Sequence, residues 1–337
     1  MHFFIFKYFN IIAAILLIFT IQPLYSLQAK TLISAQVSLL KSNNKKEADR
    51  LYKQGVNEYQ NSQFQQALIT FQKALAIYQK IASFSDVAKC LRTIGNTHYQ
   101  ISNYSQALNS LNQALIIYRD IGNSQKVVYT LNTLGAVYNQ LSQYSQAINS
   151  YQQALVISQK INDRKATLIT LNNIGTIYQS QSQYDEAIKY YYQSFKISKE
   201  IGDSEYIGAS LNNIGIIYDL TGKYYQAIDF YQQSLAFTKS AKNLKEQGQI
   251  LNNIGLVYHS LGQYDAALKY YQQALAIRKK VSDRVGEGRT LHNIGFTYSN
   301  KKQYFRAISS YQQAIVVFRT IGKQSSLGNS LNNIGYK

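Results

Sequence analysis

Side-chain amides recur at a fixed interval along this chain and are its most regular candidates for binding chemistry. The first row of asparagines comprises Asn132, Asn172, Asn212, Asn252 and Asn332, and the second row comprises Asn173, Asn213, Asn253, Asn293 and Asn333. An asparagine amide both donates and accepts hydrogen bonds, so a ladder of them can bind the backbone of an extended peptide with little regard to its sequence. In the alternative interpretation, these amides bond to neighbouring helices or to water.

Apolar and basic residues flank the asparagine rows and bear on ligand preference. Ile216, Leu256 and Phe296 form an apolar strip beside the later asparagines, whereas Arg92 and Arg289 add positive charge near the two ends. These residues favour an extended ligand with apolar side chains and an acidic group.

Residues of the kinds that perform catalysis or bind metals show no usable spacing. The sequence has no nucleophile motif and no phosphate-binding loop. His98, His259 and His292 lie far apart, and even His259, His292 and Asp219 in adjacent repeats would supply too few ligands for a convincing metal site. The single cysteine, Cys90, excludes an intramolecular disulfide. We therefore expect no enzymatic activity, no cofactor and no metal.

The elements that must position the asparagines repeat with the same interval. The block Leu171-Asn172-Asn173-Ile174-Gly175 returns, identical or nearly so, every 40 residues, at Leu91, Leu131, Leu211, Leu251, Leu291 and Leu331. Aromatic and small residues follow each block at helical spacings of three and four, which predicts two amphipathic helices per repeat. The expected N-caps of the second helices are Ser105, Ser145, Asp185 and Asp265. At the junction between repeats, Gly202 suits a C-cap and Asp203 the next N-cap.

A glycine stands at the same place in eight copies, from Gly55 to Gly335. Within a helix, glycine costs about 1 kcal/mol relative to alanine, so its recurrence requires a structural reason. We expect close helix approach, in which the segment with Tyr184 and Ala187 packs against the bare backbone of Gly175.

This pattern of glycine, tyrosine and alanine positions resembles the tetratricopeptide repeat in its 40-residue form. The resemblance covers residues 48–337 and implies an all-α fold, a right-handed superhelical solenoid of antiparallel helix pairs with seven full repeats and the first helix of an eighth. The sequence departs from the family by lacking tryptophan and by having no proline after the second helices. In such arrays the first helices line a concave groove, and the helical period leaves Asn172 and Asn173 beside the packed stripe.

The N-terminal segment has a composition of its own. Residues 1–29 combine Lys7, an apolar stretch from Ile11 to Ile21 and a following Pro23, which is typical of a secretory signal peptide. Cleavage after Ala29 is expected, with Ser26 and Ala35 as alternatives, and an uncleaved membrane anchor is the other interpretation. Residues 30–47 would form a leader, with Asn44 capping the first helix of the array. We expect an exported array, periplasmic or extracellular, or an array anchored to the membrane outside the cytoplasm.

The charge balance is basic but dilute. Lysine and arginine total 35 against 17 acidic residues, a formal net charge of +18, yet charged residues make up only 15% of the chain. The lysines are spread over many repeats, so no dense basic run points to a nucleic-acid partner. The spread positive charge leaves open a surface that binds an anionic polymer or membrane.

These observations favour a non-catalytic scaffold that binds a protein or peptide segment in its concave groove. Two alternatives remain open. Similar arrays often precede a caspase-like protease domain, so the chain would then be the recognition half of a system whose protease is separate or lost. The second alternative is the basic surface just described.

Overall fold

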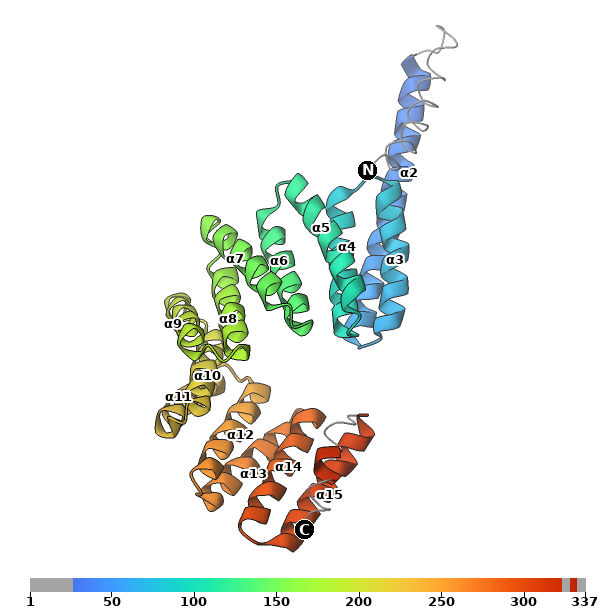
Figure 1. Ribbon diagram of the computed structural model, residues 1–337. Coiled ribbons are helices and arrows are strands. Elements are labelled where there is room, and N and C mark those ends of the chain that lie inside the picture. Colours follow the sequence, from blue (N-terminus) through green and yellow to red (C-terminus); the bar gives the residue numbers. More distant parts are fainter. Residues whose placement is uncertain (1–26, 323–327, 332–337) are drawn as a thin grey trace. The chain divides into compact units, whose positions relative to one another are not determined.

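The computed structural model describes residues 27–322 and 328–331, and side chains from Ser38 onward (Figure 1). This part of the chain contains only helices as regular elements: α2 (Leu27–Gln60), α3 (Phe64–Lys80), α4 (Phe84–Gln100), α5 (Tyr104–Asp120), α6 (Ser124–Gln140), α7 (Tyr144–Lys160), α8 (Arg164–Ser180), α9 (Tyr184–Ile201), α10 (Ser204–Leu220), α11 (Tyr224–Ser240), α12 (Leu244–Ser260), α13 (Tyr264–Lys280), α14 (Arg284–Asn300) and α15 (Tyr304–Thr320). None of the helices described is long and apolar enough to cross a membrane. The expected all-α array of helix pairs is confirmed.

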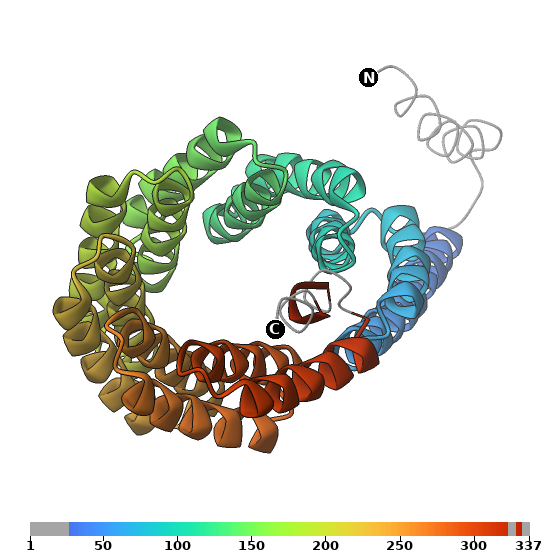
Figure 2. The same ribbon diagram turned by 60° about the horizontal axis from the view of Figure 1, so that its bottom comes forward.

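The described helices pack as successive hairpins. Each first helix contacts the second helix of its own repeat most extensively, as in the pairs α8·α9 and α10·α11, and first helices of adjacent repeats also touch, as in α10·α12 and α12·α14. The chain divides into two compact units, one ending at Ile121 and one beginning at Gly122. In Figure 2 the helices of the second unit, green to red, follow one another along a curved row.

Short turns of one design connect consecutive helices. The middle residue of each turn has a positive φ, a backbone conformation that glycine adopts without steric cost. The residues are Ser62, Ala82, Ser102, Gly122, Ser142, Asn162, Ser182, Gly202, Gly222, Lys242, Gly262, Ser282, Lys302 and Gly322. Gly202, with a φ of 71°, caps the C-terminus of α9 as expected.

The N-caps differ between the two kinds of helix. First helices of the second unit are capped by side chains: Asp203 accepts from the backbone N–H groups of Glu205 and Tyr206, and Asn123, Asp163, Asn243 and Asp283 act likewise. The expected caps Ser105, Ser145, Asp185 and Asp265 are wrong. Each lies one residue inside its helix, because the preceding tyrosine is already the first helical residue.

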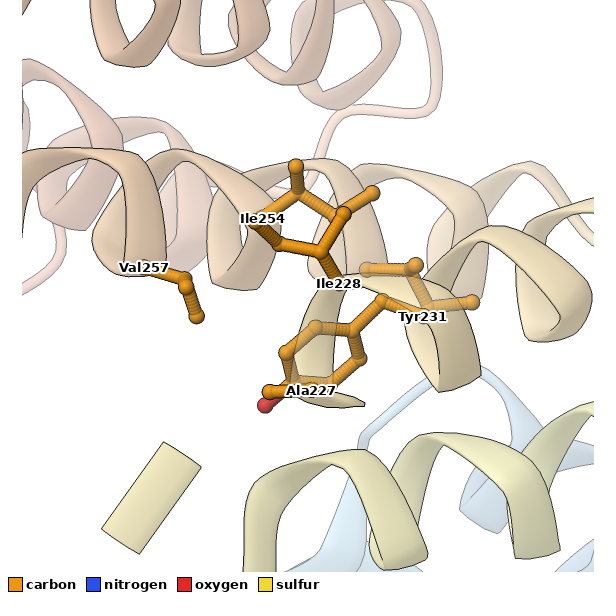
Figure 3. Packing of buried hydrophobic residues seen from close by; sticks show 6 residues of the cluster. Ala227, Ile228, Tyr231, Ile254 and Val257 are labelled. Atoms are coloured by element: carbon orange, nitrogen blue, oxygen red, sulfur yellow. The ribbon is translucent and has the colours of Figure 1, made fainter. Parts of the chain in front are cut away.

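The repeated glycines allow close contact between the paired helices, as expected. A Cβ on Gly175 would lie 2.7 Å from Cε1 of Tyr191, and one on Gly215 would lie 2.8 Å from the ring of Tyr231. The ring that fills the space is therefore Tyr191 and not Tyr184. Figure 3 shows the equivalent core around Tyr231, where Ala227 and Ile228 of α11 pack with Ile254 and Val257 of α12.

The first helix of the array extends upstream of residue 48. The leader at 30–47 and the first helix of the array form one helix, α2, so Asn44 lies inside a helix and does not cap one. The proposed signal peptide at 1–29 falls outside the described residues except for its last three positions.

Candidate functional site

Most asparagines of the first row form hydrogen bonds to other residues of the array. Asn132 on α6 donates to Thr170 Oγ1 on α8 over 2.9 Å, and its Oδ1 accepts from Asn173 Nδ2 at 3.3 Å. Asn252 on α12 is 7% exposed, and its Oδ1 accepts from Thr290 Oγ1 and from Asn293 Nδ2, each at 3.2 Å. These amides therefore connect first helices of adjacent repeats.

Asn212 and Asn172 of the first row differ in their burial and in their partners. Asn212 is 4% exposed, and its Oδ1 accepts from Asn253 Nδ2 at 3.2 Å. Asn172 instead donates to Ser194 Oγ on its own second helix at 2.7 Å. Within the described residues, Oδ1 of Asn172 is buried without a hydrogen-bond partner. Asn332 and Asn333 lie outside the described residues.

The second row is half-buried and retains hydrogen-bonding capacity. Asn173, Asn253 and Asn293 each donate once to the first row of the preceding repeat, as just described, which leaves their own Oδ1 atoms available. Asn213 is half-buried as well, and no side-chain hydrogen bond to it is found among the described residues. The second row thus offers acceptors to a backbone N–H of a ligand.

Several of the predicted residues line one cavity of about 730 Å³ between α12 and α14. The predicted residues in its wall are Asn252, Asn253, Leu256, Arg289 and Asn293. Volumes of this size are typical of sites for small molecules or for a few residues of a peptide. The structure therefore brings part of the predicted site together.

The remaining predicted residues lie elsewhere. Ile216 on α10 is half-buried, and Phe296 on α14 is 46% exposed and stacks on His259 with ring centroids 4.9 Å apart. Arg92 lies half-buried on α4 in the first unit, close to Tyr118. The positive charges of Arg92 and Arg289 therefore belong to different units.

His259 and His292 take part in contacts between repeats. Nδ1 of His259 lies 2.9 Å from Thr297 Oγ1, and Nδ1 of His292 lies 3.0 Å from Ser330 Oγ. Burial lowers the pKa of both imidazoles, which favours their neutral forms. No group of three potential metal ligands occurs in the part of the chain that the structure describes.

Comparison with known proteins agrees with this architecture. A family model described as the tetratricopeptide repeat matches residues 47–120, 126–200, 166–240 and 246–320. The chain belongs to the tetratricopeptide repeat family. A search of curated proteins finds no match.

Several solved structures have a similar fold. Aspartyl phosphate phosphatase F from Bacillus subtilis is 16% identical, with a TM-score of 0.68 over 87% of this chain and 76% of that one. The apo form of the quorum sensor NprR from B. thuringiensis is 15% identical, with a TM-score of 0.65 over 86% and 82%. A Rap protein complexed with competence and sporulation factor is 13% identical, with a TM-score of 0.55 over 87% and 97%. At these identities the likeness concerns the fold.

Sequence reasoning missed one important residue of this tetratricopeptide array. Arg278 on α13 lines the cavity although it belongs to a second helix, and it is only 6% exposed. A signal was present, because the same position in other repeats carries uncharged residues, namely Tyr78, Tyr118, Ser158, Ser198, Thr238 and Phe318. Arg278 is thus the one charged residue at a position that is uncharged in the other repeats, and charged residues are seldom buried.

Proposed function

We propose that this protein is a non-catalytic scaffold that binds an extended protein or peptide segment on the first helices of its second unit. One observation carries the proposal: five of the residues selected from sequence line the cavity between α12 and α14. A ligand there would meet half-buried amide oxygens from Asn253 and Asn293 and the exposed side chain of Leu256.

The hydrogen bonds support a more specific proposal, in which one of the two asparagine rows binds the backbone of the ligand. Asn132, Asn212 and Asn252 of the first row bond to adjacent repeats, so the second row supplies the free acceptors for the ligand backbone. Its free Oδ1 atoms can accept from backbone N–H groups, which every residue type except proline offers. Leu256 and Phe296, 38% and 46% exposed, would add apolar contact.

The test is selection from a displayed library of random ten-residue peptides by the immobilised full-length chain, at low and high salt. The groove variant combines Asn213→Ala, Leu256→Gln and Phe296→Gln. Its matched control carries the same kinds of change at exposed positions of second helices, Gln232→Ala, Val156→Gln and Val316→Gln.

We expect peptides that the wild type and the control retain at high salt and that the groove variant loses. Equal retention by the groove variant would contradict the proposal. Capture that disappears with salt in all three proteins would instead favour the basic surface, because exposed charges are screened over about 10 Å at 0.1 M salt. The location outside the cytoplasm is proposed on the N-terminal sequence alone.

A further inference from the structure

Arg278 is a buried cation whose charge is incompletely matched. It is 6% exposed, and its Nε has no hydrogen-bond partner within the described residues. The nearest carboxylate oxygen, Oδ2 of Asp283, is 4.0 Å from Nε. Oδ1 of Asp283 is already engaged, since it accepts from the backbone N–H of Gly286 at 2.9 Å. Burying a charged nitrogen without a hydrogen-bond partner is costly, and a further anion beside the guanidinium would offset that cost.

The surrounding backbone is shaped to hold this side chain. A Cβ on Gly286 would overlap the Arg278 guanidinium, lying 2.8 Å from Cζ, and a Cβ on Gly248 would lie 3.2 Å from Cγ. These two glycines come from α14 and α12, on either side of the cavity. Both stand inside helices, where glycine is unfavourable relative to alanine. Gly286 is particular to this repeat, whereas Gly248 recurs as Gly208 and Gly288, which face Thr238 and Phe318 in the same way.

The cavity has excess positive charge. Its charged lining residues are Lys245, Arg278 and Arg289 against the single carboxylate of Asp283. Burial lowers the pKa of Arg278, an effect that Asp283 opposes and Arg289 reinforces. An anion that entered the cavity would offset both the cost of burying the Arg278 charge and its repulsion by Arg289.

We infer that the cavity between α12 and α14 binds a carboxylate group of the ligand segment, with Arg278 as its buried partner. This inference rests on the proposed function and names the chemistry of one subsite. A guanidinium presents a planar fork of donors that matches a carboxylate bidentately. Arg289, exposed on α14, supplies a second positive charge at the same cavity. The carboxylate comes from an acidic side chain or from a free C-terminus.

The test uses the full-length chain and three pools of labelled ten-residue peptides built from glycine, alanine and leucine. One pool contains a single glutamate and an amidated C-terminus, the second a glutamine and a free C-terminus, and the third a glutamine and an amidated C-terminus. Fluorescence anisotropy should show that at least one carboxylate pool binds about tenfold more tightly than the neutral pool. The first two pools distinguish the two sources of the carboxylate.

The variant Arg278→Met should bind all three pools with equal affinity, at the level of the neutral pool. The matched control, Arg319→Met, changes an exposed arginine near the end of α15 and should keep the preference. Equal binding of all pools by the wild type would overturn the carboxylate site and leave the scaffold function standing. Binding of no pool would overturn both.

A stability measurement separates a binding role of Arg278 from a structural one. If the arginine is kept for a ligand, Arg278→Met should melt at the same temperature as the wild type or higher, because an unmatched buried charge is removed. If Arg278→Met melts lower and still prefers carboxylate, Arg278 is only a structural partner of Asp283, and the inference is wrong. Should Arg278→Met fail to fold, Arg278→Lys keeps the charge but loses the fork, and we expect it to lose most of the preference.

Discussion

Individual residues in this array combine packing and binding roles that the repeat pattern alone does not separate. The two rows of asparagines look alike in sequence, yet Asn252 is buried in bonds to the next repeat and Asn213 is not. The difference arises from partners 38 and 41 residues away in sequence, which only the packing of adjacent first helices brings together. Sequence reasoning could find both rows, but it could not assign their roles.

The first row should therefore contribute to stability. Asn252→Ala leaves Thr290 and Asn293 without their shared acceptor, so we expect the free energy of unfolding to fall by about 1–3 kcal/mol. The control Asn213→Ala should change it by less than about 0.5 kcal/mol. Urea unfolding followed by circular dichroism measures both values. Equal losses would contradict the division of labour between the rows.

The repeated glycines make an equally specific prediction. Gly175→Leu would place side-chain atoms inside the Tyr191 ring, so we expect a loss of about 1–3 kcal/mol in the free energy of unfolding. Lys196→Leu, an exposed substitution on α9, is the control and should have little effect. Unchanged thermal unfolding of Gly175→Leu would refute the close contact between α8 and α9.

Glu246 gives stability a pH dependence. Burial, with a smaller contribution from Glu205, raises the pKa of Glu246 to about 7 from an ordinary value of 4.5. The unfolded chain releases this proton first, so stability present below pH 4.5 is lost as the pH rises through about 7. Glu246→Gln should therefore melt like the wild type at pH 4 and at a higher temperature than the wild type at pH 8.

A second variant checks the cause of that shift. Glu205→Gln removes the neighbouring negative charge and should reduce the pH dependence that Glu246 contributes. Thermal unfolding between pH 4 and pH 8 compares the three proteins. A melting difference for Glu246→Gln that does not change with pH would rule out this account.

At the scale of elements, the sequence predicted the helices well and their beginnings less well. The 40-residue period, the paired helices and the junction at Gly202 and Asp203 are confirmed. The caps of the second helices were misplaced because the left-handed residue of each turn, such as Ser142, lies two residues before the tyrosine. Serine is only a weak indication of a left-handed backbone conformation, because it is also common at helix N-caps.

The observed N-cap Asp203 can be compared with Asp185, which the sequence predicted to be an N-cap. Asp203 accepts from two backbone N–H groups at the start of α10, so Asp203→Ala should lower the free energy of unfolding by about 1 kcal/mol. Asp185 lies one residue inside α9 without a capping bond, and Asp185→Ala should cost less than that. Thermal unfolding measures both variants. A lower melting temperature for Asp185→Ala than for Asp203→Ala would contradict the N-caps that the structure shows.

At the scale of the whole molecule, contacts between described helices are concentrated among neighbours in the chain. Such arrays behave as nearly one-dimensional stacks, in which local differences between repeats are tolerated. Arg278 and Gly286 are differences of this kind, and both line one cavity of the second unit. In our proposal, the regular repeats form the scaffold, and Arg278 and Gly286 shape the site for the ligand carboxylate.

Non-specific electrostatic binding is the main alternative to binding in the cavity, because a protein with a net charge of +18 attracts any acidic molecule. A position-specific measurement separates the two. A photoreactive amino acid placed at Leu256, in the cavity wall, or at Val316, on the exposed surface of α15, reports which surface a peptide touches. With a biotin-tagged library of random ten-residue peptides in high salt, we expect covalent adducts at Leu256 and none at Val316. Adducts at Val316 alone, or equally at both positions, would contradict binding in the cavity.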